Sequence, residues 1–520
     1  MKRALASALP ILAAAALAAC RTPERYDIVV YGGTSAGVIA AVKAARMGRS
    51  VVLIEPGRHL GGMSASGLGA TDIGNKQAIG GMAREFYRRV GTHYGQPEAW
   101  TFEPYVAERV FNELIGEGGV PVVLGERIDL QGGVHRRGAR IVRIRMESGR
   151  SFPGRVFIDC TYEGDLMALA GVTYTIGRES NDTYGETLNG VQTAQATHHQ
   201  FIKPVDPYIV PGDPSSGLLP GIEPRPPPPD GAGDPRVQAY CFRLCTTDVP
   251  ANRRPWPKPA DYDPLRYELL LRNFEADDER VPWHPVMMPN RKTDTNNNHA
   301  VSTDCIGMNY DYPDSDYATR ERIVRQHRSY TQGLLWTLAN SPRVPQTVRR
   351  HFQTWGLAAD EFADNDNWPY LLYVREARRM VGDYVMTQHD CQGRRVAEDS
   401  VGLAAYTMDS HNVQRYVDAG GHVRNEGDVQ VGGFPPYPIS YRSIVPRRDE
   451  CTNLLVPVCL SASHIAFGSI RMEPVFMVLG ESAATAAALA IEADTDVQDV
   501  PYERLAERLR AAGHVLHWPP

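Results

Sequence analysis

Residues 26–56 read YDIVVYGGTSAGVIAAVKAARMGRSVVLIEP. Ile28–Tyr31 is a short β-branched run that predicts a buried strand. A glycine-rich turn follows, and Val38 to Met47 has a helical apolar pattern that stops at a glycine. Ser50–Ile54 predicts a second buried strand. This strand–turn–helix–strand order is typical of a Rossmann-type α/β fold.

The turn between the first strand and the helix predicts a nucleotide site. Its glycines let backbone amides approach a pyrophosphate at the helix N-terminus. Glu55 lies 18 residues after Gly37, where a carboxylate can accept hydrogen bonds from ribose hydroxyls and disfavours the 2′-phosphate of NADP. Thr34 replaces the second glycine of the GxGxxG pattern, and a purely structural turn is the alternative. The predicted contacts here are Gly32, Gly33, Thr34, Ser35, Ala36, Gly37 and Glu55.

A second glycine cluster follows Glu55 within a few residues, in the stretch PGRHLGGMSASG. A simple NAD domain does not need it, whereas flavoproteins use such a cluster to let extended FAD pass close to backbone. We therefore predict FAD as the cofactor, with further contacts at Gly61, Gly62, Met63 and Ser64.

At these motifs the chain resembles the FAD-dependent oxidoreductases of bacterial secreted and polysaccharide-associated proteins, often labelled xanthan-lyase-like. More distantly it is similar to flavin domains of the fumarate-reductase type and to heterodisulfide-reductase flavin subunits. The resemblance rests on YGGTSAG, EPGRHLGGM and SGLGATD and extends from Tyr26 to about Ala490. It implies a discontinuous FAD-binding domain (25–172 and 436–520) with an inserted α+β substrate domain (173–435).

The resemblance also implies cofactor contacts far from the first turn. The stretch IDCTYEGDL returns a strand end to the cofactor and places Asp159 and Asp165 near it, although a helix cap is an equal alternative for Asp165. The C-terminal segment closes the site with Ser463 and with the helix that starts at Pro474. A positive helix end there would raise the flavin potential.

Candidate catalytic residues follow from the same segments. His464 and Arg471 rank first, with Tyr441 and Arg375 next. His389, Asp390 and His411 are further candidates for proton transfer, for which a structural role is the commoner alternative. Bidentate arginines suit either a bound carboxylate or a buried ion-pair network.

Three stretches of the middle region carry further predictions. The amide-dense run Lys292–His299 predicts an exposed loop. Residues 370–380 predict a helix that places Arg375, Arg378 and Arg379 on neighbouring faces. The Pro-rich stretch 203–235 predicts a surface excursion without a core of its own.

The N-terminus predicts export. Residues 1–19 have a basic start and an apolar run too short for a comfortable membrane span, which is typical of a signal peptide. Small residues before Cys20 resemble a lipobox, so we expect a lipidated Cys20 and a periplasmic or outer-membrane lipoprotein; an ordinary signal peptide is the alternative. Cys241 with Cys245, and Cys451 with Cys459, have spacings that allow pairing without establishing it.

Composition excludes several classes. The chain has 520 residues, 42% hydrophobic and 22% charged, with a net charge of −6. These values fit a globular protein and disfavour a nucleic-acid binder that relies on bulk positive charge. The scattered cysteines give no CxxC spacing, so we predict no metal site and no iron–sulfur cluster.

The sequence therefore predicts an FAD-dependent oxidoreductase that transfers a hydride between flavin N5 and a small polar substrate, with an unknown electron acceptor. A sugar or sugar acid is the class that the resemblance implies. Two alternatives stay open: a flavin enzyme of non-redox elimination or hydration, and a lipid-anchored binding component of a polysaccharide system.

Overall fold

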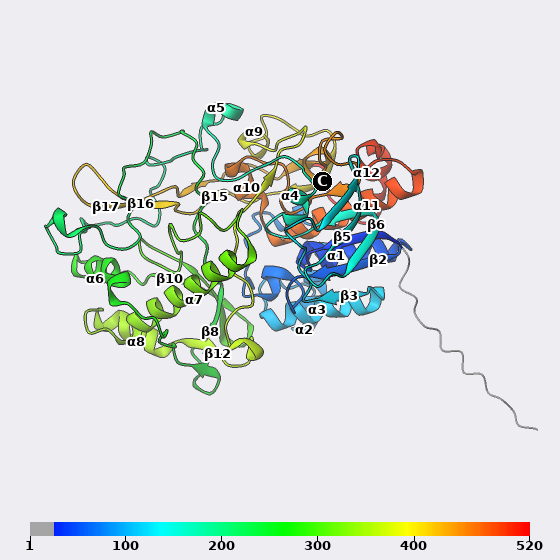
Figure 1. Cartoon of the computed structure of the whole chain (residues 1–520). Helices are drawn as coiled ribbons and strands as arrows, with labels where there is room; N and C mark the ends of the chain where they lie inside the picture. Colours follow the sequence, from blue (N-terminus) through cyan, green and yellow to red (C-terminus); the bar gives the residue numbers. More distant parts are fainter. Residues whose placement is uncertain (1–24, 520) are drawn as a thin grey trace, which may run out of the picture.

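The structure is a computed structural model that describes residues 25–519. The N-terminal and C-terminal parts of the chain lie side by side in it, and the middle of the chain forms the other side of the molecule (Figure 1). The predicted leader and Cys20 lie outside the described residues.

A mixed sheet in the order β3-β2-β1-β6-β5-β4 organises the first side. Strands β1 (Tyr26–Tyr31), β2 (Val51–Glu55) and β3 (Val122–Leu124) run parallel, because the connections between them cross over through helices. β6 (Ser151–Asp159) pairs in parallel with β1 through its C-terminal half and antiparallel with β5 (Arg140–Arg145) through its N-terminal half. β4 (Val134–Arg137) forms the edge, and β20 (Leu454–Leu455) joins β6 from the C-terminal part. The predicted α/β class is confirmed.

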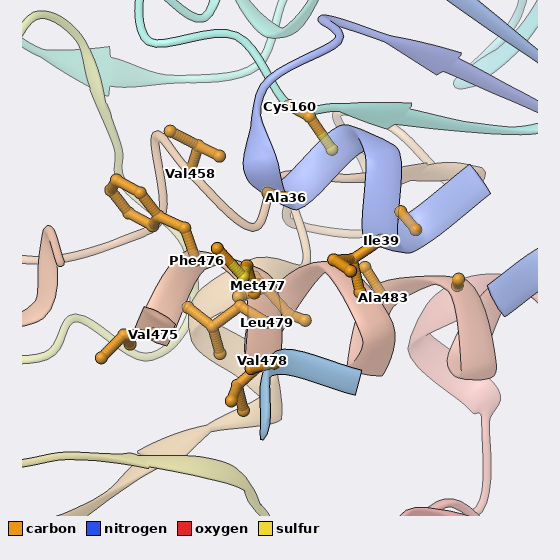
Figure 2. Close-up of a cluster of buried hydrophobic side chains, with 14 of the residues drawn as sticks. Ala36, Ile39, Cys160, Val458, Val475, Phe476, Met477, Val478, Leu479 and Ala483 are labelled. Carbon is orange, nitrogen blue, oxygen red and sulfur yellow. The ribbon is translucent and has the colours of Figure 1, made fainter. Parts of the chain in front are cut away.

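Helices α1 (Ser35–Arg46) and α11 (Glu473–Ala493) form the core against this sheet. Figure 2 shows apolar side chains of α11, among them Met477 and Ala483, next to Ala36 and Ile39 of α1. Small residues allow this approach: a Cβ added at Gly480 would lie 2.4 Å from the Ala36 carbonyl oxygen. α11 is long and apolar enough to cross a membrane, yet its apolar window is fully buried inside the protein, as in a core helix.

Three amphipathic helices complete this side: α2 (Gly81–His93), α3 (Pro104–Gly118) and α12 (Tyr502–Ala511). Pro104 occupies the first turn of α3 and Gly119 ends it in a left-handed conformation. Pro474 likewise lies in the first turn of α11.

The middle region contains a second, antiparallel sheet in the order β10-β11-β8-β12-β9. Its strands are β8 (Leu244–Thr247), β9 (Arg253–Arg254), β10 (Trp283–Met288), β11 (Lys292–Asn297) and β12 (Gly356–Ala358). Helices α6 (Glu268–Glu275), α7 (Tyr317–Asn340) and α8 (Gln346–Thr354) share its apolar core.

Short elements connect the two sides. The two-stranded pairs are β7 (Tyr174–Thr175) with β13 (Arg379–Met380), β14 (Ser400–Ala404) with β19 (Tyr437–Ser440), β15 (Met408–Ser410) with β18 (Val429–Val431), and β16 (Gln414–Val417) with β17 (Val423–Glu426). The short helices are α4 (Asp165–Leu169), α5 (Asn181–Tyr184), α9 (Gln388–Cys391) and α10 (His464–Ile470).

The exposed loop predicted at Lys292–His299 is wrong. Residues 292–297 form β11, between β10 and β8, and the Lys292 side chain is fully buried. Its ammonium lies 2.8 Å from a Glu103 oxygen and 2.7 Å from a Glu361 oxygen, while Asp294 pairs with Arg243. Polar residues fill a buried strand here because partners distant in sequence satisfy each of these charges.

The helix predicted for residues 370–380 is also wrong, since this stretch is irregular up to β13. Its arginines point to separate partners: Arg375 to Asp304, Arg378 to Asp165, and Arg379 to Glu179. An extended backbone reaches carboxylates on different elements, which a single helix would not. The Pro-rich stretch is mostly exposed, as predicted, and Val205, Leu219 and Ile222 attach it to the core of the middle region.

Candidate active site at the junction of the two sides

The turn after β1 presents the N-terminus of α1. Thr34 caps the helix, with its hydroxyl accepting from the Gly37 amide at 3.3 Å and donating to the Cys160 carbonyl at 2.7 Å. Gly32 has φ +97°, and a Cβ there would meet backbone of Cys160 and Thr161 at 2.8 Å. The Ser35 hydroxyl is buried without a hydrogen-bond partner in the described protein, which leaves a donor beside the helix N-terminus for a ligand anion.

Glu55, at the end of β2, faces this turn. Its carboxylate accepts from the Gly33 amide at 2.6 Å and from the Gly57 amide at 2.5 Å. Burial raises the pKa of Glu55 to about 7, although both amides lower it. The carboxylate is therefore desolvated and has capacity for further donors.

The second glycine cluster lies directly against the first. Gly61 and Gly62 both have positive φ, and a Cβ on Gly62 would lie 2.3 Å from the Tyr162 hydroxyl. That hydroxyl accepts from the Met63 amide at 2.9 Å and donates to Glu473 at 2.7 Å. Ser64 also donates to Glu473, so the start of α11 is tied to this strip of backbone.

Two cavities flank the turn at Glu55–Pro56. The first has a volume of about 260 Å³, and its lining includes Glu55, Arg58, Gly62, Ala65, Ser66, Tyr370 and Leu371. The second, of about 400 Å³, is lined by Pro56, the aromatic rings of Tyr312 and Tyr317, and Arg127 and Arg320. Flat aromatic walls, arginines and a ribose-facing carboxylate together suit a dinucleotide.

The predicted contacts outside the turn lie at different depths. Asp159 is buried and its oxygens accept from Thr161 and from the Met167 amide. Asp165 pairs with both Arg320 and Arg378 in the wall of the second cavity, and Gly164, not Asp165, is the helix cap. The Ser463 hydroxyl donates to Glu186 and caps α10.

Beyond the second glycine cluster lies a group of buried charges that we call the junction cluster, because residues 67–72 of the first side and several segments of the middle region meet there. Tyr373 packs against Met63 and Leu68, and its hydroxyl accepts from Arg471 at 2.8 Å. Most of the cluster's charged members form ion pairs within the group, whereas Asp72 and Asp428 form none there. The charged members are Asp72, Arg243, Asp294, Asp304, Arg375, Asp409, His411, Asp428 and Arg471.

His411 lies at the centre of the junction cluster. Its Nδ1 is 2.7 Å from Asp304 and its Nε2 is 3.6 Å from Asp409. Burial and Arg375 oppose protonation, but the two carboxylates outweigh them and the pKa of His411 is raised. Burial, with Asp409 nearby, raises the pKa of Asp428 to about 7. The cluster thus holds groups that can exchange protons near neutral pH.

His464, the first residue of α10, is held in place on both ring nitrogens. Nδ1 lies 2.7 Å from Glu376 and Nε2 lies 3.0 Å from the Ser410 hydroxyl. Burial, reinforced by Arg379 and Arg178, lowers the pKa of His464 to about 3. This histidine is therefore neutral at physiological pH. Its hydrogen-bond partner, Ser410, directly precedes His411 in the chain.

The structure places two of the four predicted catalytic residues, Arg471 and Arg375, in the junction cluster and a third, His464, beside it through Ser410. Tyr441 is not there: its hydroxyl donates to the Val497 carbonyl beneath the C-terminal segment. His389, a half-buried residue of α9, donates from its ring to the Gly185 carbonyl at 3.0 Å. Residues 25–519 contain no group of three or more His, Cys, Asp or Glu arranged for a metal ion, and all seven cysteines within them are unpaired.

A family model described as FAD dependent oxidoreductase matches residues 27–509, nearly the whole of the described chain. The chain belongs to this family. It is an FAD-dependent oxidoreductase.

Curated relatives match over short stretches. The chain is 53% identical over 51 residues to a vinyl phenol reductase of Lactiplantibacillus plantarum and 40% identical over 58 residues to a 3-oxosteroid 1-dehydrogenase of Mycolicibacterium smegmatis. These stretches cover 9% and 11% of this chain, and the chain spans about a tenth of each relative.

Solved structures overlap with about a third of the chain. An L-amino acid deaminase from Proteus vulgaris is 14% identical, with coverage of 30% of this chain and 53% of that chain and a TM-score of 0.24. A thioredoxin reductase of T. acidophilum is 14% identical over 26% of this chain and 35% of that chain, with a TM-score of 0.19.

The residues of this flavoenzyme fit FAD. Glu55 would hold the ribose, the orphaned Ser35 hydroxyl and the α1 amides would hold the pyrophosphate, and the strip Gly61–Ser64 would run beside the flavin half. The junction cluster begins one side chain beyond that strip, at Tyr373.

Sequence reasoning missed most of the junction cluster. Asp304 and Asp409 stand in stretches that have no motif of their own, and Tyr373 follows an apolar run that predicts no site. Asp72 ends the SGLGATD stretch that carries the family resemblance, which is the one local signal for its position.

Proposed function

We propose that this enzyme transfers a hydride between flavin N5 and a small polyhydroxylated substrate, of the sugar or sugar-acid class, held at the junction cluster. The observation that carries the proposal is the position of this cluster, directly beyond the strip Gly61–Ser64 and lined by paired donors and acceptors. Bound FAD supplies the hydride acceptor or donor. The protein's residues bind the substrate, exclude water and move its proton.

The charges of the cluster favour neutral hydroxyl groups within this class. Arg243, Arg375 and Arg471 already pair with Asp294, Asp304 and Asp409, respectively. A further anion would therefore meet neutralised arginines, and also Asp72 and Asp428, which pair with no arginine in the described chain. A polyol can donate to the carboxylates and accept from the guanidiniums, so it satisfies both signs of charge.

We assign the proton step to His411. Its two carboxylate neighbours stabilise the protonated ring, so in the oxidative direction it accepts a hydroxyl proton only above its raised pKa. Oxidation by this enzyme should therefore speed up as pH rises through that pKa, and reduction should slow down. His464 acts as a positioning residue in this proposal, because its ring holds Ser410 beside His411.

The test is an anaerobic titration of the purified flavoprotein with aldoses, uronic acids and polyols, followed by loss of the oxidised flavin absorbance. His411→Gln should slow flavin reduction by about 10²- to 10⁴-fold with unchanged bound flavin. His389→Gln is the matched control, since this half-buried histidine of α9 bonds to the Gly185 carbonyl and to no member of the junction cluster. Equal rates of flavin reduction in His411→Gln and His389→Gln would show that His411 does not transfer the substrate proton.

The substrate class has its own contrary outcomes. Tighter binding of uronic acids than of the matching neutral sugars would contradict the charge argument. Turnover of a sugar with no change in flavin absorbance would favour the non-redox alternative, elimination or hydration.

We further propose that the enzyme is an exported lipoprotein of the cell envelope, which rests on the sequence of residues 1–20 alone. Membrane fractionation of the full chain with Cys20→Ala as the comparison tests it. Retention of the variant in the membrane fraction would contradict the lipid anchor.

A further inference from the structure

The middle region contains a separate cavity of about 210 Å³ that the flavin site does not use. Its mouth lies at Pro220 and Gly221, two exposed residues of the Pro-rich stretch. Its walls are apolar, with Leu269 from α6 and with Val301 and Ile306. The cavity is therefore open to solvent at one end and apolar inside.

Two arginines, Arg266 and Arg415, line this apolar cavity. Arg415 is 5% exposed, with Nε donating to the Asn425 side chain at 3.1 Å and one terminal nitrogen donating to the Ala300 carbonyl at 3.0 Å. The other terminal nitrogen faces the mouth, 3.7 Å from a Cβ built on Gly221. Arg266 lies half-buried with its guanidinium 5.7 Å from the Tyr330 ring centre.

Among residues 25–519, no carboxylate oxygen lies within 4.0 Å of a guanidinium nitrogen of Arg266 or Arg415. This is exceptional for the interior of this protein, where Arg178, Arg243 and Arg375 each carry at least one carboxylate partner. Burial lowers the pKa of Arg415, and the opposing effects of Tyr330, Cys305 and the more distant Asp304 do not compensate for it. A buried guanidinium that lacks an anion is costly unless a ligand supplies one.

We propose that this cavity is a second ligand site, which binds a small organic monoanion: a carboxylate with a compact apolar body. The carboxylate would pair with Arg415 and Arg266 at the mouth, and the apolar body would contact Leu269, Val301 and Ile306. A bidentate guanidinium suits a carboxylate, and the apolar wall favours an organic acid over inorganic phosphate.

The site lies back to back with the junction cluster. Cys305 lines the cavity, while the preceding residue, Asp304, contacts His411 and Arg375. Tyr330, another lining residue, donates to the Ser302 carbonyl in the same segment. The two sites thus share the chain segment 302–305 but no lining side chain, and the proposal does not depend on the substrate proposed above.

Isothermal titration calorimetry of the purified full-length flavoprotein with benzoate tests the site, and benzyl alcohol and inorganic phosphate serve as comparison ligands. We expect one benzoate site, with Arg415→Met weakening its affinity by about tenfold or more, the effect of losing a charge-assisted hydrogen bond. Arg266→Gln should weaken benzoate binding several-fold. Because Arg266 is half-exposed, this substitution should affect folding less than Arg415→Met does. Arg225→Gln, an exposed arginine of the same Pro-rich stretch, should bind as the wild type does.

Three results would overturn the proposal. Unchanged benzoate affinity in both Arg415→Met and Arg266→Gln would show that neither arginine binds the carboxylate. Equal affinity for benzyl alcohol would show that the site does not require a negative charge. Phosphate binding as tight as that of benzoate would show that the apolar wall does not contribute to affinity. Benzoate binding that Arg471→Lys abolishes and Arg415→Met retains would place the ligand in the junction cluster instead.

Discussion

Glu55 offers the sharpest test of the cofactor site, because its carboxylate is part-buried in the wall of the first cavity before any ligand binds. Burial raises its pKa to about 7 against the two backbone amides that lower it. Ribose hydroxyls donate to the ionised form, so a proton on Glu55 competes with the cofactor. FAD affinity of the wild-type protein should therefore fall as pH falls.

The magnitude follows from that pKa. If the ionised carboxylate alone accepts both hydroxyls, the dissociation constant for FAD rises by about tenfold for each pH unit below the pKa, or about 1.4 kcal/mol per unit. Between pH 8 and pH 6 this amounts to roughly tenfold weaker binding. Above pH 8 the affinity should level off.

Glu55→Gln removes the charge and should remove the pH dependence with it. One of the two amides, from Gly33 or Gly57, would then face the NH₂ group of the glutamine. Together with the weaker ribose bonds this should cost about 1.5–3 kcal/mol, a loss of affinity of roughly 10- to 100-fold at pH 8.

The assay is fluorescence titration of FAD with deflavinated protein at pH 6, 7 and 8. Glu85→Gln is the matched control, because Glu85 lies on α2 and pairs at the surface with Arg46 and Arg89. An FAD affinity that is flat across this pH range, or wild-type affinity in Glu55→Gln, would refute the assignment of Glu55 to the ribose.

Two further predictions concern stability. Lys292→Met should destabilise the protein by about 3–5 kcal/mol, since it leaves buried carboxylates unpaired. Thermal unfolding should show a larger loss of stability at pH 8 than at pH 6. Burial raises the pKa of Glu361 to about 7, and its protonated form needs no cation. Gly480→Ala should destabilise by about 1–3 kcal/mol in urea unfolding, because its Cβ would lie 2.4 Å from the Ala36 carbonyl oxygen. The same change at Gly116, where a Cβ meets nothing within 4 Å, should instead stabilise by up to about 1 kcal/mol, and a stabilised Gly480→Ala would contradict the close packing of α1 and α11.

The arrangement of charges also explains why the two sites can differ in ligand. In the junction cluster each arginine meets an aspartate, which favours hydroxyl groups. In the second cavity Arg415 and Arg266 meet none within the described chain, which favours an acid. Neutralised and unneutralised arginines thus distinguish the two sites by charge alone.

The sequence by itself determined the nucleotide-binding unit, because its signals are local. The strands, the turn and Glu55 fall within 30 residues, and alternation of apolar runs with glycines is enough to specify them. The helix from Pro474 was predictable for the same reason, since its first-turn proline and alanine-rich run are properties of one segment.

Only the tertiary structure decided the junction cluster and the polar strand β11. His411 and Arg471 were candidates from their own segments, but Asp304, which lies 2.7 Å from His411, is more than 100 residues away in the chain and has no motif of its own. Lys292 and Asp294 predict a loop until Glu361 and Arg243 are seen to neutralise them. A charge can be buried only where another part of the chain supplies its partner, and that pairing has no trace in local sequence.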